Sequence, residues 1–280
     1  MHRQYLTMGT FLQISVYDTD IHRAEQSVER AAQAVLSAEQ RLSNWIATSE
    51  ISAFNAALSS ATLYASSATL SADLAQAEQC RMATDGYFQP RVGAAAGVAL
   101  TDTVSPVAVD SGGFGKGLAL DQAVEAAGFG PGSRAFLNLG GQVAVYGAAM
   151  AVPLAHPDNR GQVMVLLRVP AGYSLSVSGR HVADADTDIE RPTVDHILNP
   201  ITGGVVQRGD MALVRSTSAF WADCLSTAFY AVGPEGASRL DANVRRHAPA
   251  YAAALIGTVA DRPAVLWQSA GWDHELEPHQ

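Results

Sequence analysis

Charged residues make up only 16% of this 280-residue chain, and basic residues are the scarcer kind, with 18 lysines and arginines against 27 aspartates and glutamates. The net charge of −9 and the pI near 5.3 give no electrostatic footprint for a nucleic-acid backbone or an anionic membrane. We therefore expect no nucleic-acid partner. An anionic ligand would need local help from a metal ion, a helix N-terminus or a few placed cations.

Cysteine is also scarce, since the chain holds only Cys80 and Cys224. Two cysteines exclude a disulfide framework and a cysteine-rich metal site, and we expect both to be small buried apolar residues. No apolar run approaches the roughly 20 residues of a membrane span, and no apolar stretch follows the first nine residues. We expect no transmembrane segment and a cytoplasmic protein as written, or a periplasmic or membrane-anchored one if a leader was removed.

Small and apolar residues are what the chain does contain, with hydrophobic residues at 48%. This share is typical of a globular protein, and 280 residues can bury a substantial core. Length alone allows one or two domains, and we expect residues 1–280 to form one compact, enzyme-sized domain.

The hydrophobic periodicity predicts a mixture of strands and helices. Leu12, Ile14 and Val16 alternate with polar residues as in a half-buried strand, and Asp20 stands as N-cap before a long amphipathic helix that reaches Leu42. No regular βαβ rhythm follows, so we predict an α+β fold with mixed, largely antiparallel sheets and packed helices. Further helices are expected at about 71–84, 118–127 and 218–232, and strands at 107–110, 136–139, 143–146, 163–169, 173–177, 196–197, 253–259 and 264–267.

A glycine-rich turn, Ser111–Gly117, lies between a predicted strand and a predicted helix. Its four glycines would let backbone N–H groups approach a phosphate, at the positive end of the following helix. Lys116 would add a charge, and Asp110 could hold a ribose, a base edge or a metal. The spacing matches neither the P-loop nor the dinucleotide fingerprint, so a purely structural turn is the alternative.

The predicted helix at 218–232 carries Asp223 and Thr227, four residues apart and therefore on one face. A carboxylate and a hydroxyl offer two oxygens to a hard cation. Magnesium suits this pair because it prefers one or two protein carboxylates together with ligand phosphates and water. On these residues alone, an ordinary polar helix face with a hydrogen-bonded aspartate is the better explanation.

Two further residues have a structural and a functional interpretation. Histidine occurs in proteins both as a hydrogen-bonded structural residue and as a catalyst, so His196 has two possible interpretations. Trp45 stands at the end of the first long helix, where an aromatic ring is either part of the core or a stacking surface for a flat ring.

Seven short segments carry a resemblance that extends along nearly the whole chain. They are Met8-Gly9-Thr10, Ser49–Asn55, Thr84–Phe88, Asp110–Gly117, Asn138–Gly141, His196–Gly203 and Ala222–Thr227. In residue type and in order they resemble the motifs of the ApbE family of flavin transferases. Each motif is modest by itself, whereas seven in the family's order are specific.

The resemblance implies an ApbE-like fold with an FAD cleft between subregions, in which FAD is the substrate and Mg²⁺ the metal. It implies that Met8 and Trp45 flank the flavin, with tryptophan where relatives often have tyrosine. The other implied FAD-binding residues are Gly86, Tyr87, Phe88, Asp110, Lys116, His196 and Ile197. The implied magnesium ligands are Asp223, Thr227 and a backbone carbonyl at Gly113 or Gly115.

The activity implied by the resemblance is Mg²⁺-dependent transfer of FMN from FAD to a Ser or Thr hydroxyl of an acceptor protein, with release of AMP. Asp223 and Asp110 are the candidate catalytic residues, and Asp110 would steer or deprotonate the acceptor or only bind FAD. The alternatives are an FAD pyrophosphatase that yields FMN and AMP, and a non-catalytic FAD-binding protein. Besides FAD and the acceptor, a second copy of the chain is a possible partner.

The chain departs from the family pattern near the expected pocket mouth. Gln89 and Arg91 replace an aspartate and a threonine, a short run at 94–101 replaces a Trp-Gly-Phe segment, and Arg180 replaces an acid. We expect these differences to bear on the acceptor protein more than on FAD.

Overall fold

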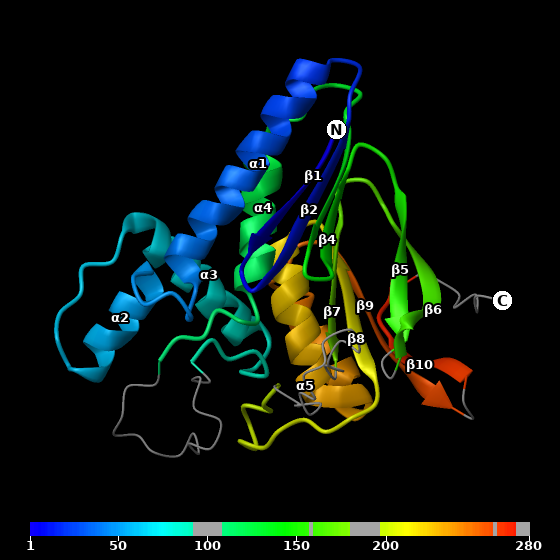
Figure 1. The fold of residues 1–280 in the computed structure, drawn as a ribbon. Helices are drawn as coiled ribbons and strands as arrows, with labels where there is room; N and C mark the ends of the chain where they lie inside the picture. The colour runs from blue at the N-terminus through cyan, green and yellow to red at the C-terminus, as the bar shows by residue number, and fades with distance from the viewer. Residues whose placement is uncertain (92–107, 157–158, 180–196, 260–261, 273–280) are drawn as a thin grey trace.

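The computed structural model describes residues 1–91, 108–156, 159–179, 197–259 and 262–272, and its main feature is an eight-stranded sheet (Figure 1). The strand order is β1-β2-β3-β4-β7-β8-β9-β10, and every neighbouring pair is antiparallel. The strands are β1 (His2–Thr7), β2 (Thr10–Tyr17), β3 (Arg134–Leu139), β4 (Gln142–Tyr146), β7 (Ser174–Gly179), β8 (Met211–Ser216), β9 (Tyr251–Val259) and β10 (Arg262–Gln268).

The two faces of this sheet are covered differently. Helices α1 (Ile21–Leu42), α4 (Gly115–Ala127) and α5 (Ala219–Val244) lie along one face, and a separate hairpin of β5 (Met150–His156) and β6 (Asn159–Val169) lies on the other (Figure 1). Helices α2 (Glu50–Ser59) and α3 (Ala68–Ala83) lie beside the lower end of α1. The predicted α+β architecture with largely antiparallel sheets is therefore confirmed.

Separate apolar cores fill the space on each side of the sheet. On the helical side, Ile14 of β2 is buried with Val28 of α1 and Leu120 of α4. The alternation that predicted β2 faces this core, and Leu12, Ile14 and Val16 are each at most 1% exposed. On the other side the sheet residues pack against apolar side chains of the β5–β6 hairpin, among them Leu167. Both faces of the central strands are thus buried.

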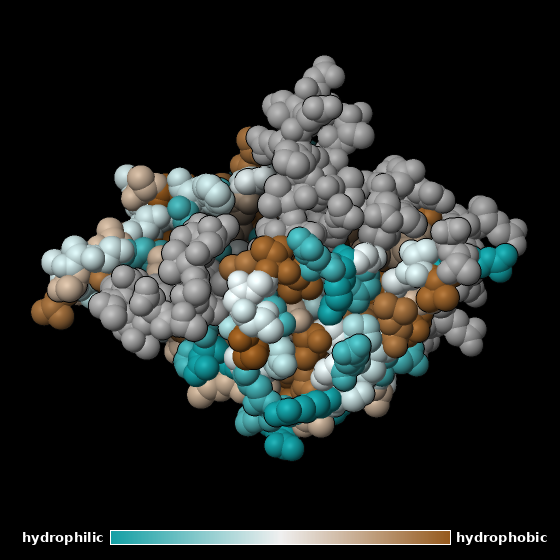
Figure 2. Space-filling model, turned by 90° about the horizontal axis from the view of Figure 1, so that it is seen from below, coloured by the Kyte–Doolittle hydropathy of each residue, from teal (hydrophilic) through white to brown (hydrophobic). Residues whose placement is uncertain are grey.

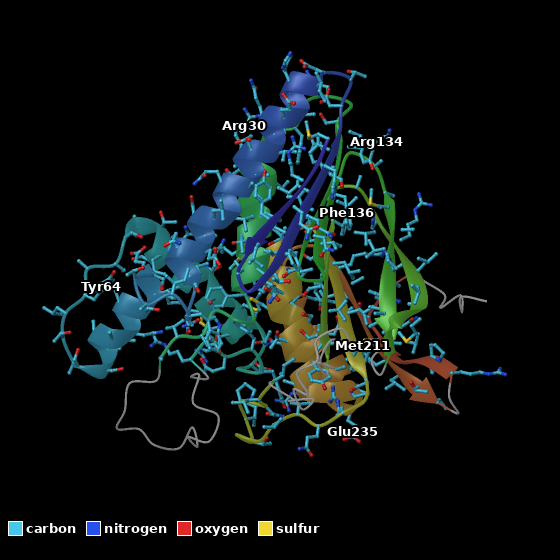
Figure 3. All side chains as sticks on the ribbon, in the orientation of Figure 1. Arg30, Tyr64, Arg134, Phe136, Met211 and Glu235 are labelled. Atoms are coloured by element: carbon cyan, nitrogen blue, oxygen red, sulfur yellow. The ribbon has the colours of Figure 1, made fainter. Side chains whose placement is uncertain are left out.

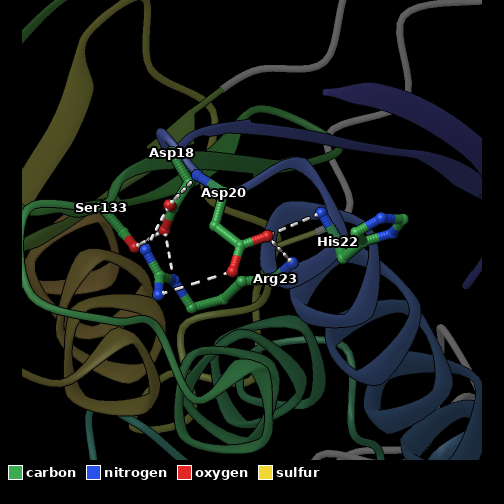
Figure 4. A network of polar contacts seen from close by, with 5 residues as sticks. All are labelled: Asp18, Asp20, His22, Arg23 and Ser133. Atoms are coloured by element: carbon green, nitrogen blue, oxygen red, sulfur yellow. Dashed lines mark hydrogen bonds and ion pairs between the residues drawn. The ribbon is translucent and has the colours of Figure 1, made fainter.

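A polar network fixes the start of α1 (Figure 4). Asp20 is the N-cap, as predicted, and accepts hydrogen bonds from the backbone N–H groups of His22 and Arg23. Asp18, which follows β2, accepts a bond of 2.8 Å from Nε of Arg23 and another from the hydroxyl of Ser133, just before β3. The network therefore ties the end of β2 to α1 and to the turn that leads into β3.

Most predicted elements are present, but the described parts of two predicted strands, at 107–110 and 196–197, are not strands. Residues 108–110 are not in a strand, and Ile197 lies outside any strand, beside an isolated bridge between Leu198 and Val205. The predicted helix at 218–232 is right, but a helix resumes after Gly233, where φ is 75°, because Pro234 can begin a new helical stretch. The elements not predicted are β1, β5, β8 and α2.

The structure also bears on two expectations that rest on composition. Cys80 and Cys224 are both free and buried, as expected. Among the helices of the described ranges, none combines the length and apolar character that crossing a membrane requires.

Candidate functional site

The glycine-rich turn leads into α4, whose first turn receives a cap from another helix. Phe114 occupies the N-cap position and makes no side-chain capping bond. Instead, Oδ2 of Asp223 in α5 accepts a hydrogen bond of 3.0 Å from the backbone N–H of Gly117. Since the first N–H groups of a helix have no partner within the helix, Asp223 stabilises the start of α4 from outside.

Gly117 is required by the close approach of the two helices. A methyl group at its Cα would lie 2.3 Å from the carbonyl oxygen of Ala219 and 2.8 Å from Cβ of Asp223. No side chain fits at such distances, so at this position glycine allows helix packing. The sequence pattern indicates a phosphate cradle, whereas the position of Gly117 is explained by packing.

Gly113, Asp223 and Thr227, the predicted metal group, lie together where the glycine turn meets α5. A methyl group on Gly113 would lie 3.3 Å from Oγ1 of Thr227, which in turn donates a bond of 3.2 Å to the carbonyl oxygen of Asp223. The structure thus brings the Thr227 hydroxyl to the backbone of Gly113, and the Asp223 carboxylate lies four residues further along the chain, at Gly117. Their role as metal ligands stays a prediction.

The Asp223 carboxyl lies in an unusual electrostatic environment, because the residue is only 5% exposed. Burial raises its pKa, and the positive charge of Lys116, the N–H of Gly117 and the side chain of Ser176 each oppose that rise. The positive charge of a bound cation would act in the same direction as these three groups.

Asp110 and Lys116 both contact Gly112. Oδ1 of Asp110 accepts a bond of 2.8 Å from the backbone N–H of Gly112, and Nζ of Lys116 lies 3.4 Å from its carbonyl oxygen. The predicted acid and the predicted cation are therefore at the same turn, and both side chains are half-buried. Each retains an accessible part that a ligand could contact.

Two asparagines that the sequence analysis did not single out hold the segment before this turn. Asn55 bonds Val109 on both sides, accepting from its N–H at 2.8 Å and donating to its carbonyl at 2.9 Å. Asn44 donates to the same carbonyl at 2.7 Å and accepts from the N–H of Ser111 at 2.9 Å. The two amide side chains bond this backbone as a neighbouring strand would. The backbone on either side of Asp110 is therefore held in place, although it belongs to no sheet.

Hydroxyl groups of β7 and α5, also missed in the sequence, adjoin the Asp223–Thr227 face. Oγ of Ser226 lies 3.1 Å from that of Ser176 and 2.8 Å from that of Ser178. Oγ of Ser178 is 3.5 Å from Oγ1 of Thr227. No spacing rule signals this group, because its members come from elements about 50 residues apart.

The Gly86–Phe88 segment reaches the same turn from the end of α3. Asp85 and Gly86 have φ values of 50° and 81°, and this left-handed turn directs the chain to Phe88, which is buried. The Phe88 ring packs edge-on against Phe114, and its Cε2 would lie 3.3 Å from a methyl group on Gly113. Tyr87 is partly buried against the apolar core that includes Phe88 and Phe114.

The remaining predicted residues differ in how closely they approach the turn. A methyl group on Gly115 would lie 3.6 Å from Cε of Met8, so Met8 is at the site. Trp45 is 95% exposed, so it is no core residue and is free to stack on a ligand. Ile197 is partly buried against the core, and His196 lies outside the described residues.

A cavity of about 440 Å³ elsewhere in the molecule is not part of this site. It is lined mainly by Met1, Arg3, Glu25, Gln26, Glu29 and Arg30. It lies along the upper half of α1, where Figure 3 labels Arg30, whereas the glycine turn is at the lower end of α4. Its walls carry charges of both signs and none of the motif residues.

The grouping of possible metal ligands and the character of the lower surface are two further properties of the described residues. In the ranges that the structure describes, no three His, Cys, Asp or Glu side chains are grouped so that they could hold a metal ion by themselves. Seen from below, the surface formed by the described residues has separate apolar groups interrupted by hydrophilic ones (Figure 2). A metal here would need oxygen atoms from a bound ligand in addition to those of the protein.

Comparison with known proteins gives one family match and several structural matches. The sequence matches the ApbE family over residues 8–103 and 94–252. None of the curated protein sequences compared with the chain matches it.

The fold resembles three solved ApbE structures over most of each chain. The ApbE protein of Thermotoga maritima has a TM-score of 0.72 at 20% identity, covering 91% of this chain and 94% of its own. The flavinyl transferase ApbE of Pseudomonas stutzeri in its apo form has a TM-score of 0.70 at 19% identity, covering 98% and 95%. The flavin transferase ApbE of Vibrio cholerae has a TM-score of 0.68 at 20% identity, covering 97% of each chain.

Proposed function

The chain belongs to the ApbE family, and on that premise we propose that it transfers FMN from FAD to a Ser or Thr hydroxyl of an acceptor protein and releases AMP. The observation that carries the proposal is that α5 meets the glycine turn at the start of α4, where Thr227 lies against Gly113 and the Asp223 carboxylate accepts the N–H of Gly117. The positive end of α4 and the charge of Lys116 favour a phosphate near this turn, although the N–H groups of Gly112 and Gly117 already bond the carboxylates of Asp110 and Asp223. FAD supplies that phosphate in its pyrophosphate group.

The residues present fit a magnesium ion that binds together with FAD. Asp223 offers a carboxylate, Thr227 a hydroxyl and Gly113 a backbone carbonyl, all of them oxygen atoms of the hard type that Mg²⁺ prefers. One protein carboxylate suffices when the pyrophosphate and water supply the other ligands. When bound, the ion would neutralise charge that develops on the pyrophosphate.

The remaining groups hold the reactants in place. Lys116 would contact the pyrophosphate, and Asp110, held by the Asn44 and Asn55 amides through Val109, would face the acceptor hydroxyl. In the transfer, the hydroxyl oxygen forms a bond to the FMN phosphorus while the bond from that phosphorus to the AMP oxygen breaks. The hydroxyl proton would pass to Asp110, and AMP departs as the leaving group.

The test is a reaction of the purified protein with FAD and Mg²⁺, with and without a candidate acceptor that carries a Ser/Thr flavinylation site. We expect AMP release and a flavin-fluorescent acceptor band on a denaturing gel, both dependent on Mg²⁺. AMP and free FMN without a band would instead identify an FAD pyrophosphatase. A protein that binds FAD tightly but releases no AMP with any of several acceptors would be a flavin-binding protein, and the proposed transfer would be wrong.

A further inference from the structure

Met8 has an unusual backbone conformation for its residue type. Its φ is 51°, and in the described part of the chain only Ala61 and Asp85 share a positive φ without being glycine. Glycine adopts this region freely, whereas a long side chain is strained there. A strained residue that persists at a candidate site indicates that its side chain is needed, because glycine would relieve the strain.

Glu39 of α1 holds this conformation with both oxygens of its carboxylate. Oε1 accepts a bond of 2.5 Å from the backbone N–H of Met8, and Oε2 accepts one of 2.7 Å from the hydroxyl of Thr7. Thr7 is 3% exposed, so the bond to its hydroxyl is shielded from water. One bond holds the side chain of Thr7 and the other holds the backbone of Met8. Together they fix the turn between β1 and β2.

The fixed turn directs the Met8 side chain to the first turn of α4. Met8 is partly buried against the core formed by α1, α4 and the first strands, and its Cε approaches Gly115. Gly115 is the first residue of α4 and lies two residues after Gly113, which contacts Thr227. The Glu39 carboxylate therefore determines where the Met8 side chain lies at the edge of the candidate site. Glu39 does not have to contact the site itself to have this effect.

We infer that Glu39 is a positioning residue for FAD, which acts by holding Met8 in the left-handed conformation that places its side chain against the bound flavin nucleotide. The inference rests on the proposed function. A purely structural role for Glu39, the attachment of β1 to α1, would affect stability alone. The two roles differ in whether the effect of Glu39 on FAD binding depends on the Met8 side chain.

The test is a double-mutant cycle on FAD affinity, measured by quenching of flavin fluorescence well below each variant's unfolding temperature. The variants are Glu39→Gln, Met8→Gly and the two combined, and Glu29→Gln on the exposed side of α1 is the matched control. Glutamine keeps an oxygen for the Met8 N–H, and its NH2 group can donate to the Thr7 hydroxyl, so this substitution removes the negative charge of the acceptor while it retains the shape of the side chain. Met8→Gly keeps the backbone N–H but removes the side chain and the strain.

We expect Glu39→Gln to weaken FAD binding about fivefold, the effect of replacing a charged acceptor of the Met8 N–H by a neutral one. Met8→Gly should weaken it at least as much without lowering the unfolding temperature. In the Met8→Gly background, Glu39→Gln should add less than about a twofold change, because a residue that acts through Met8 has no further effect once that side chain is gone. Glu29→Gln should leave the affinity unchanged.

Two results would overturn the inference while leaving the proposed function intact. One is an unchanged FAD affinity in Glu39→Gln, and the other is an equal loss in the Met8 and the Met8→Gly backgrounds. Absence of FAD binding in the wild-type protein would instead overturn the proposed function, and the inference with it.

Discussion

At the scale of single residues, the structural role of Asp223 can be separated from the role that we propose for it in the reaction. Its Oδ2 accepts the N–H of Gly117 and so stabilises the start of α4, and its carboxylate is the one acidic side chain in the predicted metal group. An asparagine side chain can still accept the Gly117 N–H, but it lacks the negative charge. The stability of the protein and its activity should therefore respond differently to substitution.

We predict that Asp223→Asn lowers the free energy of unfolding by less than about 1 kcal/mol, whereas Asp223→Ala lowers it by about 1–3 kcal/mol because a buried N–H loses its partner. Both variants should lose Mg²⁺-dependent AMP release. Urea unfolding and an AMP assay measure the two effects. A fully active Asp223→Asn protein would show that the carboxylate charge has no part in the reaction.

At the scale of elements, α4 and α5 cap each other. Asp121 of α4 accepts bonds from the N–H groups of Ala219 at 2.7 Å and Phe220 at 3.0 Å, while Asp223 of α5 accepts from Gly117. Each helix thus satisfies N–H groups in the first turn of the other. The pair places the glycine turn against Thr227, so the geometry of the site depends on how closely these helices pack.

The Gly117→Ala substitution tests this close packing. Because the added methyl group would lie 2.3 Å from the carbonyl oxygen of Ala219, we predict a loss of about 1–3 kcal/mol in the free energy of unfolding, with a parallel loss of FAD affinity. Gly209→Ala is the control, since a methyl group there would meet no atom within 4 Å. Equal unfolding midpoints for the two variants in urea would contradict the helix geometry.

The Asp18 network gives a pH-dependent prediction for the connection between β2 and α1. Hydrogen bonds from Arg23 and Ser133 hold the pKa of the Asp18 carboxyl well below its usual range. A carboxyl whose pKa is lowered on folding adds stability above its unfolded pKa of about 4, and that contribution disappears as the pH falls through the folded value. The difference in melting temperature between wild type and Asp18→Asn should be largest near neutral pH and should shrink below about pH 4. A difference that stays constant down to the lowest pH measured would contradict this.

At the scale of the whole molecule, the sequence predicts best those elements whose own side chains determine their structure. Asp20 and the helical spacing from Ala24 to Leu42 predicted α1, and the alternation at Leu12, Ile14 and Val16 predicted β2. β8 was missed because all its residues are buried, which leaves no alternation to detect. β1 was missed because most of its residues are exposed at the edge of the sheet.

The predicted strand at 107–110 shows why the candidate site is harder to predict than the core. Val109 has the apolar character of a strand residue, but Asn44 and Asn55 bond to its backbone in place of a strand. Side-chain partners 54 and 65 residues away leave no periodic signal. Asp223 and Thr227 could be predicted to share a face because one helix carries both, whereas the proximity of Thr227 to Gly113 and the bond between Glu39 and Met8 required the fold.

The measurement that tests the central claim most directly is mass spectrometry of an acceptor protein after incubation with the enzyme, FAD and Mg²⁺. The proposed function predicts an acceptor peptide that carries FMN in a phosphoester bond to a Ser or Thr hydroxyl, with one AMP released for each modified acceptor, and no such peptide with Asp223→Asn. Equal amounts of AMP and free FMN beside an unmodified acceptor would contradict it, and would show that water takes the place of the acceptor hydroxyl.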